Sequence, residues 1–176
     1  MNTGRLAGLF SPRSIAIVGA SDRNFYARNA LHRLNACGYA GEVHLVNPRA
    51  DAVAGHTCQP SVSAAVREAG RAVDLVFVAV PRAAVVPALE DAAAAGARAA
   101  VIVTTGFGES HDAEGRRLQT ELAAWIARSS ISVCGPSCLG VINVHGRMQA
   151  FGGHPGTDIL PGSVALVSQS GANVHT

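Results

Sequence analysis

The sequence predicts an α/β protein with a Rossmann-like, doubly wound, mostly parallel sheet and helices on both faces. Short apolar runs alternate with segments of helical periodicity along the chain, which is the pattern of parallel βαβ units. Hydrophobic residues make up 48% and charged residues 15%, a balance typical of a compact core. The 176 residues suit one domain, and a domain of this size buries about 70% of the surface of its unfolded chain.

The first predicted βαβ unit lies near the N-terminus. The run SIAIV at 14–18 is short and apolar, and it ends at Gly19. Residues 24–37 carry apolar side chains at helical spacing and stop before a glycine, as a helix does. EVHLVNP at 42–48 is a second strand that a proline closes.

In the middle of the chain, the sequence pattern predicts two helices with a buried strand between them. A short helix at 60–69 begins with a proline–serine pair, which is a start signal. VDLVFVAV at 73–80 is almost continuously apolar, so this strand is expected to be covered on both faces. The helix at 82–95 contains Pro87, which can shift or kink its first turn.

The remaining elements continue the alternation. AAVIVTT at 99–105 is the fourth strand, the amphipathic stretch 112–128 is a helix, and SISVCG at 130–135 is the fifth strand. VINV at 141–144 is an additional strand, and SVALVS at 163–168 reads as a buried parallel strand. Together these elements predict one sheet extended by right-handed crossovers.

Ligands of such sheets bind beyond the carboxyl ends of the strands. This rule selects the loops that follow the strands and precede the helices. They are residues 19–24, 47–51, 80–82, 104–109 and 135–140.

The first loop has features of a phosphate-binding turn. Gly19 permits backbone angles closed to other residues, and Ser21 or Asp22 can cap the following helix. The helix N-terminus then offers N–H groups and a partial positive charge to an anion. The dinucleotide fingerprint G-x-G-x-x-G is absent, because Gly19 is the only glycine of this turn. An ordinary strand-to-helix turn is the alternative interpretation.

The second loop argues against NAD. Asn47, Pro48 and Arg49 follow the second strand, and no acidic residue occurs before Asp51, whereas NAD sites usually place an acid there to hold the ribose. A cation suits a phosphorylated ribose, as in NADP or the 3′-phosphate of coenzyme A. A solvated surface arginine is the alternative.

Composition excludes several other classes of function. Fourteen basic and 12 acidic residues give a net charge of +2, which is too balanced to favour nucleic acid or a membrane surface. Aromatic residues make up only 5%, which argues against a base-stacking platform. No signal-peptide pattern and no apolar run of about 20 residues occur, and the four cysteines form no secreted-type framework. A cytoplasmic protein is expected.

No metal site and no catalytic residue are predicted. The cysteines and histidines near the C-terminus lack the spacing of zinc ligands. The polar residues of GFGESHD at 106–112 are better explained as helix capping. Neither a P-loop nor a G-x-S-x-G nucleophile elbow followed by a helix occurs.

Six segments carry a family resemblance when they are taken together and in order. They are IAIVGASD, VHLVNP, DLVFVAVP, VTTGFGE, GPSCLGVIN and GSVALVSQSGA. Residues 9–173 resemble the coenzyme A-binding domain of NDP-forming acyl-CoA synthetases. That superfamily includes the succinyl-CoA ligase α subunit and ADP-forming acetate–CoA ligase, and a similar domain is fused to some protein acetyltransferases.

The resemblance implies coenzyme A or acyl-CoA as the ligand. It assigns the nucleotide end of the ligand to the first loop and to the segment after the second strand. The residues after the third and fourth strands continue the cradle. Carried over by motif, the binding residues are Gly19, Ala20, Ser21, Asp22, Arg23, Asn24, Asn47, Pro48, Arg49, Val80, Pro81, Thr104, Thr105 and Gly106.

The chain departs from the family pattern in one loop. The family's GPNCLG is GPSCLG here, with Ser137 in place of asparagine. Serine is shorter and has one donor fewer, so a contact of this loop or with a partner is expected to be weaker. Cys138 either faces the thiol end of the ligand or is a small buried residue.

The resemblance also divides the chain. Residues 1–160 correspond to the coenzyme A-binding domain, and residues 161–176 to the start of a truncated second, flavodoxin-like ligase domain. The implied role is the N-terminal domain of an ADP-forming acid–CoA ligase whose phosphohistidine and ATP-grasp parts are absent from this chain, with a ligase or ATP-grasp subunit as a partner. Alternatives are a stand-alone CoA-sensing module, the CoA-binding part of a protein acetyltransferase and, less favoured, an NADP-dependent oxidoreductase.

Overall fold

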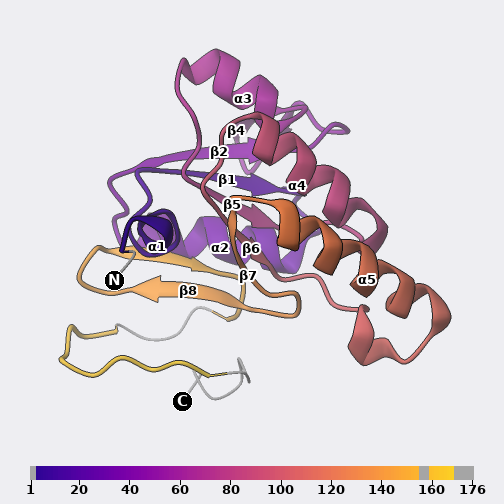
Figure 1. The fold of residues 1–176 in the computed structure, drawn as a ribbon. Helices are drawn as coiled ribbons and strands as arrows, with labels where there is room; N and C mark the ends of the chain where they lie inside the picture. Colours follow the sequence, from indigo (N-terminus) through magenta and orange to yellow (C-terminus); the bar gives the residue numbers. More distant parts are fainter. Residues whose placement is uncertain (1–2, 155–158, 169–176) are drawn as a thin grey trace.

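A seven-stranded sheet forms the centre of the molecule (Figure 1). The computed structural model describes residues 3–154 and 159–168. The strands of the main sheet are β1 (Ser14–Val18), β2 (Glu42–Val46), β3 (Ala52–Val53), β4 (His56–Gln59), β5 (Leu75–Val78), β6 (Ala99–Ile102) and β7 (Ser132–Cys134). Their order is β3-β4-β2-β1-β5-β6-β7. All neighbours pair in parallel except the edge strand β3, which is antiparallel to β4.

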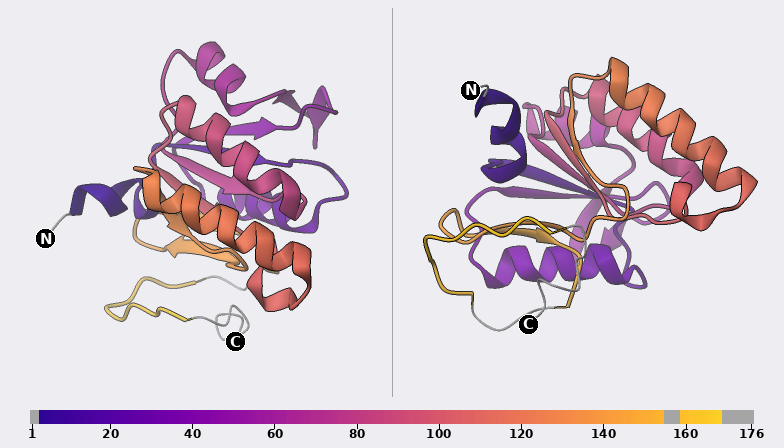
Figure 2. Two further views of the ribbon diagram at one scale, coloured as in Figure 1. Left: turned by 45° about the vertical axis from the view of Figure 1, so that its right-hand side comes forward. Right: turned by 60° about the horizontal axis from the view of Figure 1, so that its bottom comes forward.

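The chain order reverses between β1 and β5, so the sheet is doubly wound. The helices are α1 (Thr3–Phe10), α2 (Phe25–Ala36), α3 (Val62–Ala69), α4 (Val85–Ala94) and α5 (Ala113–Arg128). A hairpin of β8 (Gly140–Asn143) and β9 (Met148–Phe151) packs against α2. Figure 2 shows α2 and this hairpin on one side of the sheet and α4 and α5 on the other. The predicted fold class is therefore confirmed.

Alternate strand residues build two cores, one on each face of the sheet. On β5, Leu75 and Phe77 belong to the core beneath α2 and the hairpin, while Val76 and Val78 belong to the core beneath α3, α4 and α5. All four side chains are fully buried, and burial of each is worth about 1.5–3 kcal/mol. The continuous apolar character of this strand follows from its being covered on both faces.

Pro87 lies in the first turn of α4. A short 3₁₀ turn, Arg82–Ala84, precedes this helix, which begins only at Val85. The first amides of a helix have no intrahelical partner, so a proline that lacks an N–H costs nothing there. The predicted helix at 82–95 is thus present, with its beginning wound more tightly.

The predicted strand at 163–168 is wrong. These residues form no strand, and Val164, Leu166 and Val167 are 91%, 67% and 97% exposed. A parallel strand needs a neighbour to accept its hydrogen bonds, and within the described residues the main sheet ends at β7. Residues 169–176, which belong to the proposed second domain, lie outside the described part of the chain.

Among the helices that the structure describes, none has the length and apolar character needed to cross a bilayer. The longest, α5, has 16 residues and carries charged side chains along its exposed face.

Candidate functional site at the carboxyl edge of the sheet

The residues predicted to bind a ligand lie in loops at the carboxyl ends of β1, β2, β5 and β6. β1 and β5 are neighbours in the sheet, and the strand order reverses between them. Open α/β sheets bind ligands in the crevice at such a reversal. The first and third loops therefore flank the expected binding position.

Gly19 allows the first loop to turn sharply against β5. Its φ is +88°, and a Cβ at this position would collide with the carbonyl oxygen of Ala79. Its amide donates to the Val46 carbonyl at 2.9 Å, so the turn is also tied to β2. A residue with a side chain would be strained in this backbone conformation and would have no room for its Cβ.

Asn24 is the N-cap of α2 and joins two loops of the site. Its Oδ1 accepts from the Ala27 amide at 3.2 Å, while its Nδ2 donates to the carbonyls of Gly19 at 2.9 Å and Ala79 at 2.7 Å. The carbonyls belong to the loops after β1 and β5, which are thereby held at a fixed separation. The oxygen of this side-chain amide caps α2, and its nitrogen links the two loops.

The prediction that Ser21 or Asp22 caps α2 is wrong. The Ser21 hydroxyl accepts from the Arg23 amide at 3.1 Å, within the loop itself. Asp22 Oδ1 accepts from the Ala54 amide at 3.1 Å, in the turn between β3 and β4. The loop is longer than a single capping turn, so the cap falls on Asn24 and Asp22 instead attaches the β3–β4 hairpin.

A small pocket lies between this loop and the β3–β4 hairpin, with a volume of about 50 Å³. Its lining includes Ala20, Ser21 and Asp22 of the first loop, Leu31 of α2 and Val53 of β3. The lining surface is largely apolar. Its position shows that the hairpin at 52–59 contributes to the surroundings of the first loop.

The second loop contacts the first through Asn47. Asn47 Nδ2 donates to the Ala20 carbonyl at 2.7 Å, and its Oδ1 accepts from the Arg49 amide at 2.9 Å. The Arg49 side chain is exposed and forms no ion pair or hydrogen bond within the residues described here. Asn47 is thus a structural support, whereas Arg49 offers an uncompensated positive charge beside the first loop.

The third and fourth loops are joined in the same way. The Thr104 hydroxyl donates to the Val80 carbonyl at 2.7 Å. The Arg82 guanidinium donates to the carbonyl of Gly106 at 2.8 Å, and Gly106 has a φ of +95°. Pro81 and Thr105 are exposed beside them. The structure therefore brings all four predicted segments to one edge of the sheet.

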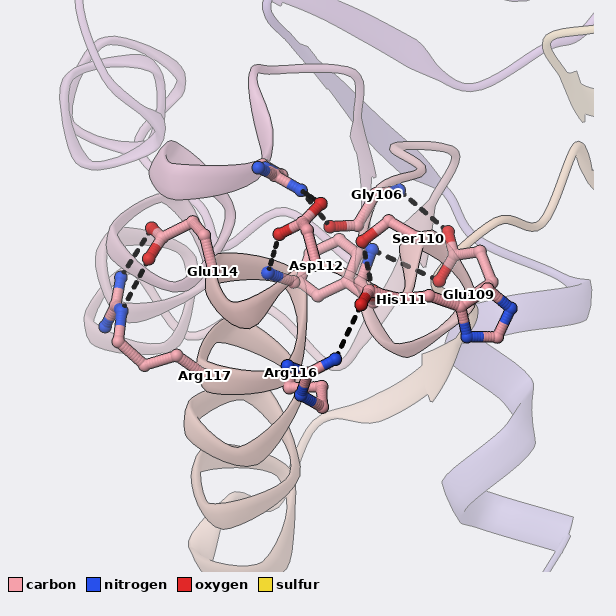
Figure 3. A network of polar contacts seen from close by, with 11 residues as sticks. Gly106, Glu109, Ser110, His111, Asp112, Glu114, Arg116 and Arg117 are labelled. Atoms are coloured by element: carbon pink, nitrogen blue, oxygen red, sulfur yellow. Dashed lines mark hydrogen bonds and ion pairs between the residues drawn. The ribbon is translucent and has the colours of Figure 1, made fainter.

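A network of polar residues outside the predicted set of binding side chains supports the fourth loop (Figure 3). Glu109 accepts from the amides of Gly106 at 2.7 Å and Phe107 at 3.1 Å. Asp112, the N-cap of α5, accepts from the Arg82 guanidinium at 2.9 Å and from the Gly115 amide at 2.6 Å. The expected capping role of GFGESHD is confirmed for Asp112, while Glu109 instead stabilises the loop itself.

The charges of these two carboxylates are stabilised by their partners. Arg82, with help from the Gly115 amide, holds the pKa of Asp112 well below its usual range. Burial alone would raise the pKa of Glu109, but the hydrogen bonds from Ser137 and from the loop amides outweigh it and lower that pKa. Both groups are therefore acceptors rather than proton donors at neutral pH.

The fifth loop packs against the fourth. Ser137 donates from its hydroxyl to Glu109 at 2.7 Å and from its amide to the Thr104 carbonyl at 3.0 Å. Cys138 is half-buried, and its sulfur lies 3.3 Å from that of Cys134. The described residues contain no group of three or more histidine, cysteine or acidic side chains arranged to hold a metal ion.

Sequence comparison relates this chain to known families. The family model described as "CoA binding domain" matches residues 13–144. The ADP-forming acetate–CoA ligase I subunit alpha of Pyrococcus furiosus is 32% identical over 168 residues, which cover 95% of this chain and 36% of the relative. The ADP-forming 4-hydroxybutyrate–CoA ligase of Nitrosopumilus maritimus is 29% identical over 164 residues, covering 93% and 23%.

Solved structures give the same relationship. A dinucleotide forming acetyl-coenzyme A synthetase 1 from Ca. Korarchaeum cryptofilum, in complex with phosphate and ADP, superposes with a TM-score of 0.82 at 32% identity, covering 96% of this chain and 34% of that one. PH0766 from Pyrococcus horikoshii OT3 superposes with a TM-score of 0.83 at 31% identity, covering 97% and 37%. The chain thus spans about a third of the length of the relatives or less.

Proposed function

Because this chain belongs to the CoA-binding domain family, we propose that it binds coenzyme A or acyl-CoA across the carboxyl edge of its sheet. The observation that carries the proposal is the exposed Arg49 guanidinium, which has no polar partner among the described residues and lies beside a glycine turn that Asn24 and Asn47 hold in place. The two asparagines fix the loops before any ligand arrives. A preformed site loses less conformational entropy on binding.

The nucleotide end of the ligand lies on the first two loops in this proposal. Backbone N–H groups near the start of α2 face its phosphates, where the helix dipole favours negative charge. Arg49 binds the 3′-phosphate through a charge-assisted contact. The carbonyl oxygens of Gly19 and Ala79 already accept hydrogen bonds from Asn24. They are therefore not free acceptors that would repel the phosphates of the ligand.

The third and fourth loops continue the cradle toward the thiol end. Val80, Pro81, Thr104, Thr105 and Gly106 present small side chains and backbone at this edge. The remaining proposed residues belong to two loops: Ala20, Ser21, Asp22 and Arg23 to the first, and Pro48 to the second. The role of Asp22 is to attach the β3–β4 hairpin rather than to contact a phosphate, because its charge repels one.

The larger reaction is also a proposal. The chain is the CoA-binding part of an ADP-forming acid–CoA ligase in the cytoplasm. The phosphohistidine and ATP-grasp functions belong to other domains or to a partner chain, and residues from 161 onward correspond to the beginning of the ligase domain. Similarity to CoA ligases along more than nine-tenths of this chain supports this role.

Calorimetric titration with three ligands tests the proposal. Coenzyme A is expected to bind most tightly, dephospho-coenzyme A more weakly because it lacks the 3′-phosphate, and NADPH not at all. Binding of NADPH in preference to coenzyme A would instead favour a dinucleotide-dependent oxidoreductase. Absence of coenzyme A binding by the folded chain would refute the proposal.

A further inference from the structure

Cys134 and Cys138 form a pair of facing thiols at the edge of the sheet. Cys134 is the last residue of the edge strand β7, and the loop at 135–137 turns the chain back so that the two sulfurs lie 3.3 Å apart. Gly135 and Ser137 both have positive φ, +115° and +58°. Both cysteines are half-buried, so small molecules are not fully excluded from them.

We propose that Cys134 and Cys138 are a reversible redox site, which closes to an intrachain disulfide when a low-molecular-weight disulfide oxidises it. A disulfide bond is about 2.0 Å long, so the sulfurs must approach by about 1.3 Å from their separation in the reduced protein. The loop between them has no regular secondary structure, so its backbone can make this adjustment.

Either sulfur can donate across this 3.3 Å contact, and the arrangement with Cys134 as the donor favours one order of reaction. When Cys134 donates to the sulfur of Cys138, it holds the pKa of Cys138 below the ordinary thiol value and raises its own. The thiolate is the nucleophile in disulfide exchange. With this donor, Cys138 is expected to attack first and Cys134 to resolve the mixed disulfide.

The chemistry balances with glutathione disulfide as the oxidant. The Cys138 thiolate attacks one sulfur of glutathione disulfide, forms a mixed disulfide and releases a glutathione thiolate. That thiolate takes the proton of Cys134, whose sulfur then attacks Cys138 and expels the second glutathione thiolate. Two protein thiols lose two electrons and two protons in total, and glutathione disulfide is reduced to two thiols.

The other two cysteines are internal controls. Cys58 is buried, and burial raises its pKa. Cys37 donates to the carbonyl of Arg147 at 2.9 Å, and burial raises its pKa as well. Within the described residues neither has another thiol at hydrogen-bond distance. Oxidation is therefore expected at one pair alone.

The redox pair is connected directly to the proposed ligand cradle. The loop that separates the cysteines holds the Thr104 carbonyl through the Ser137 amide and holds Glu109 through the Ser137 hydroxyl. Glu109 in turn supports the Gly106 amide. Closing the disulfide pulls on this chain of contacts, so the oxidised protein is expected to bind coenzyme A at least threefold more weakly; this second part rests on the proposed function.

Oxidation of the intact chain tests the first part. The protein is incubated with excess glutathione disulfide, denatured, alkylated with N-ethylmaleimide and mapped by mass spectrometry. We expect a loss of two hydrogen masses in the peptide that contains Cys134 and Cys138, alkylation of Cys37 and Cys58, and alkylation of all four cysteines after reduction. Four alkylated cysteines after oxidation, or a disulfide that includes Cys37 or Cys58, would overturn the proposal.

Single substitutions test the order of attack. Cys134→Ser should retain one glutathione on Cys138, because no resolving thiol remains, and Cys138→Ser should leave Cys134 unmodified. The double variant Cys37→Ser/Cys58→Ser should still close the disulfide. Retention of glutathione on Cys134 alone would reverse the assigned order.

Affinity measurements separate this site from the proposed function. Equal affinities of the reduced and oxidised proteins for coenzyme A would reject the coupling but leave the disulfide established. Failure of the reduced protein to bind coenzyme A would reject the proposed function, while the mass measurement would still decide the redox site.

Discussion

At the scale of single residues, Arg49 allows the most direct test of phosphate recognition. Its side chain is exposed and has no polar partner in the part of the molecule that the structure describes. We expect Arg49→Glu to weaken binding of coenzyme A by roughly 1–3 kcal/mol more than binding of dephospho-coenzyme A, because only the former carries the 3′-phosphate. Calorimetric titration of both ligands gives this difference.

Arg67→Glu is the matched control, since it makes the same charge change on the exposed surface of α3. It should leave the ratio of the two affinities unchanged. Equal losses of both ligands in Arg49→Glu would remove the assignment of Arg49 to the 3′-phosphate.

Substitutions at two glycines distinguish the free-energy cost of backbone strain from that of a steric clash. Gly19 and Gly70 have φ of +88° and +69°, but a Cβ meets the Ala79 carbonyl at Gly19 and has nothing within 4 Å at Gly70. We expect Gly70→Ala to reduce the free energy of unfolding by roughly 1–2 kcal/mol and to leave coenzyme A binding intact. Gly19→Ala should cost more and abolish binding, as measured by urea denaturation and calorimetry. Normal affinity in Gly19→Ala would show that this turn only connects β1 to α2.

At the scale of elements, Asn24 ties helix α2 to the sheet. Asn24→Ala removes the helix cap and leaves the carbonyls of Gly19 and Ala79 without their partner. We expect it to lower the free energy of unfolding by about 2–3 kcal/mol. Ser61→Ala removes a cap alone, that of α3, and should cost about 1 kcal/mol. Similar losses in urea denaturation would mean that the clamp between the loops adds no stability.

The beginning of α5 makes stability depend on pH. The pKa of Asp112 is depressed in the folded protein, chiefly by Arg82, so its contribution is present above the ordinary aspartate pKa and is lost as the pH falls toward the folded value. Asp112→Asn keeps an oxygen to cap Gly115 but has no charge. We expect thermal melts from about pH 5 to about pH 2 to show a smaller loss of stability in this variant than in the wild type.

Asp51→Asn is the control for this experiment, because the Asp51 side chain has no hydrogen bond or ion pair among the residues that the structure describes. It should follow the wild-type acid curve. If Asp112→Asn follows that curve too, the Arg82 contact does not contribute to acid stability.

Elements were predictable where the pattern of side chains is local and strong. β5 is buried on both faces and reads as a strand, and α5 is amphipathic and long. The strand β4, with the sequence HTCQ, is largely polar and lies beside the short edge strand β3, so it gives no such signal. The apolar run at 163–168, which is also part of a family motif, predicts a strand, although pairing depends on a neighbouring strand that local sequence does not specify.

The site was predictable as a set of loops but not as a set of contacts. The motifs place Gly19, Asn47 and Thr104 at strand ends, and the structure brings these ends together. The hydrogen bond from Ser137 to Glu109 joins residues 28 positions apart, and the role of Asn24 depends on a carbonyl of β5's loop. Such contacts arise from tertiary structure and leave no signal in the local sequence, whereas the cap of α2 is local and depends on the length of the first loop.

At the scale of the whole molecule, binding and catalysis are expected to be separable. The chain spans about a third or less of the length of its ligase relatives. We expect the purified 176-residue chain to bind coenzyme A, yet to form no acyl-CoA from acid, coenzyme A and ATP. It should also gain no acid-labile phosphate from labelled ATP. Turnover by the chain alone, followed by chromatography of the products, would contradict this division.

The division of β5 between two cores has a consequence for how the molecule comes apart. Phe77 faces one core and Val78 the other, so the backbone that joins them cannot loosen one layer and keep the other. The core on each face of the sheet therefore depends on the core on the other face. Unfolding should consequently be all-or-none across the sheet.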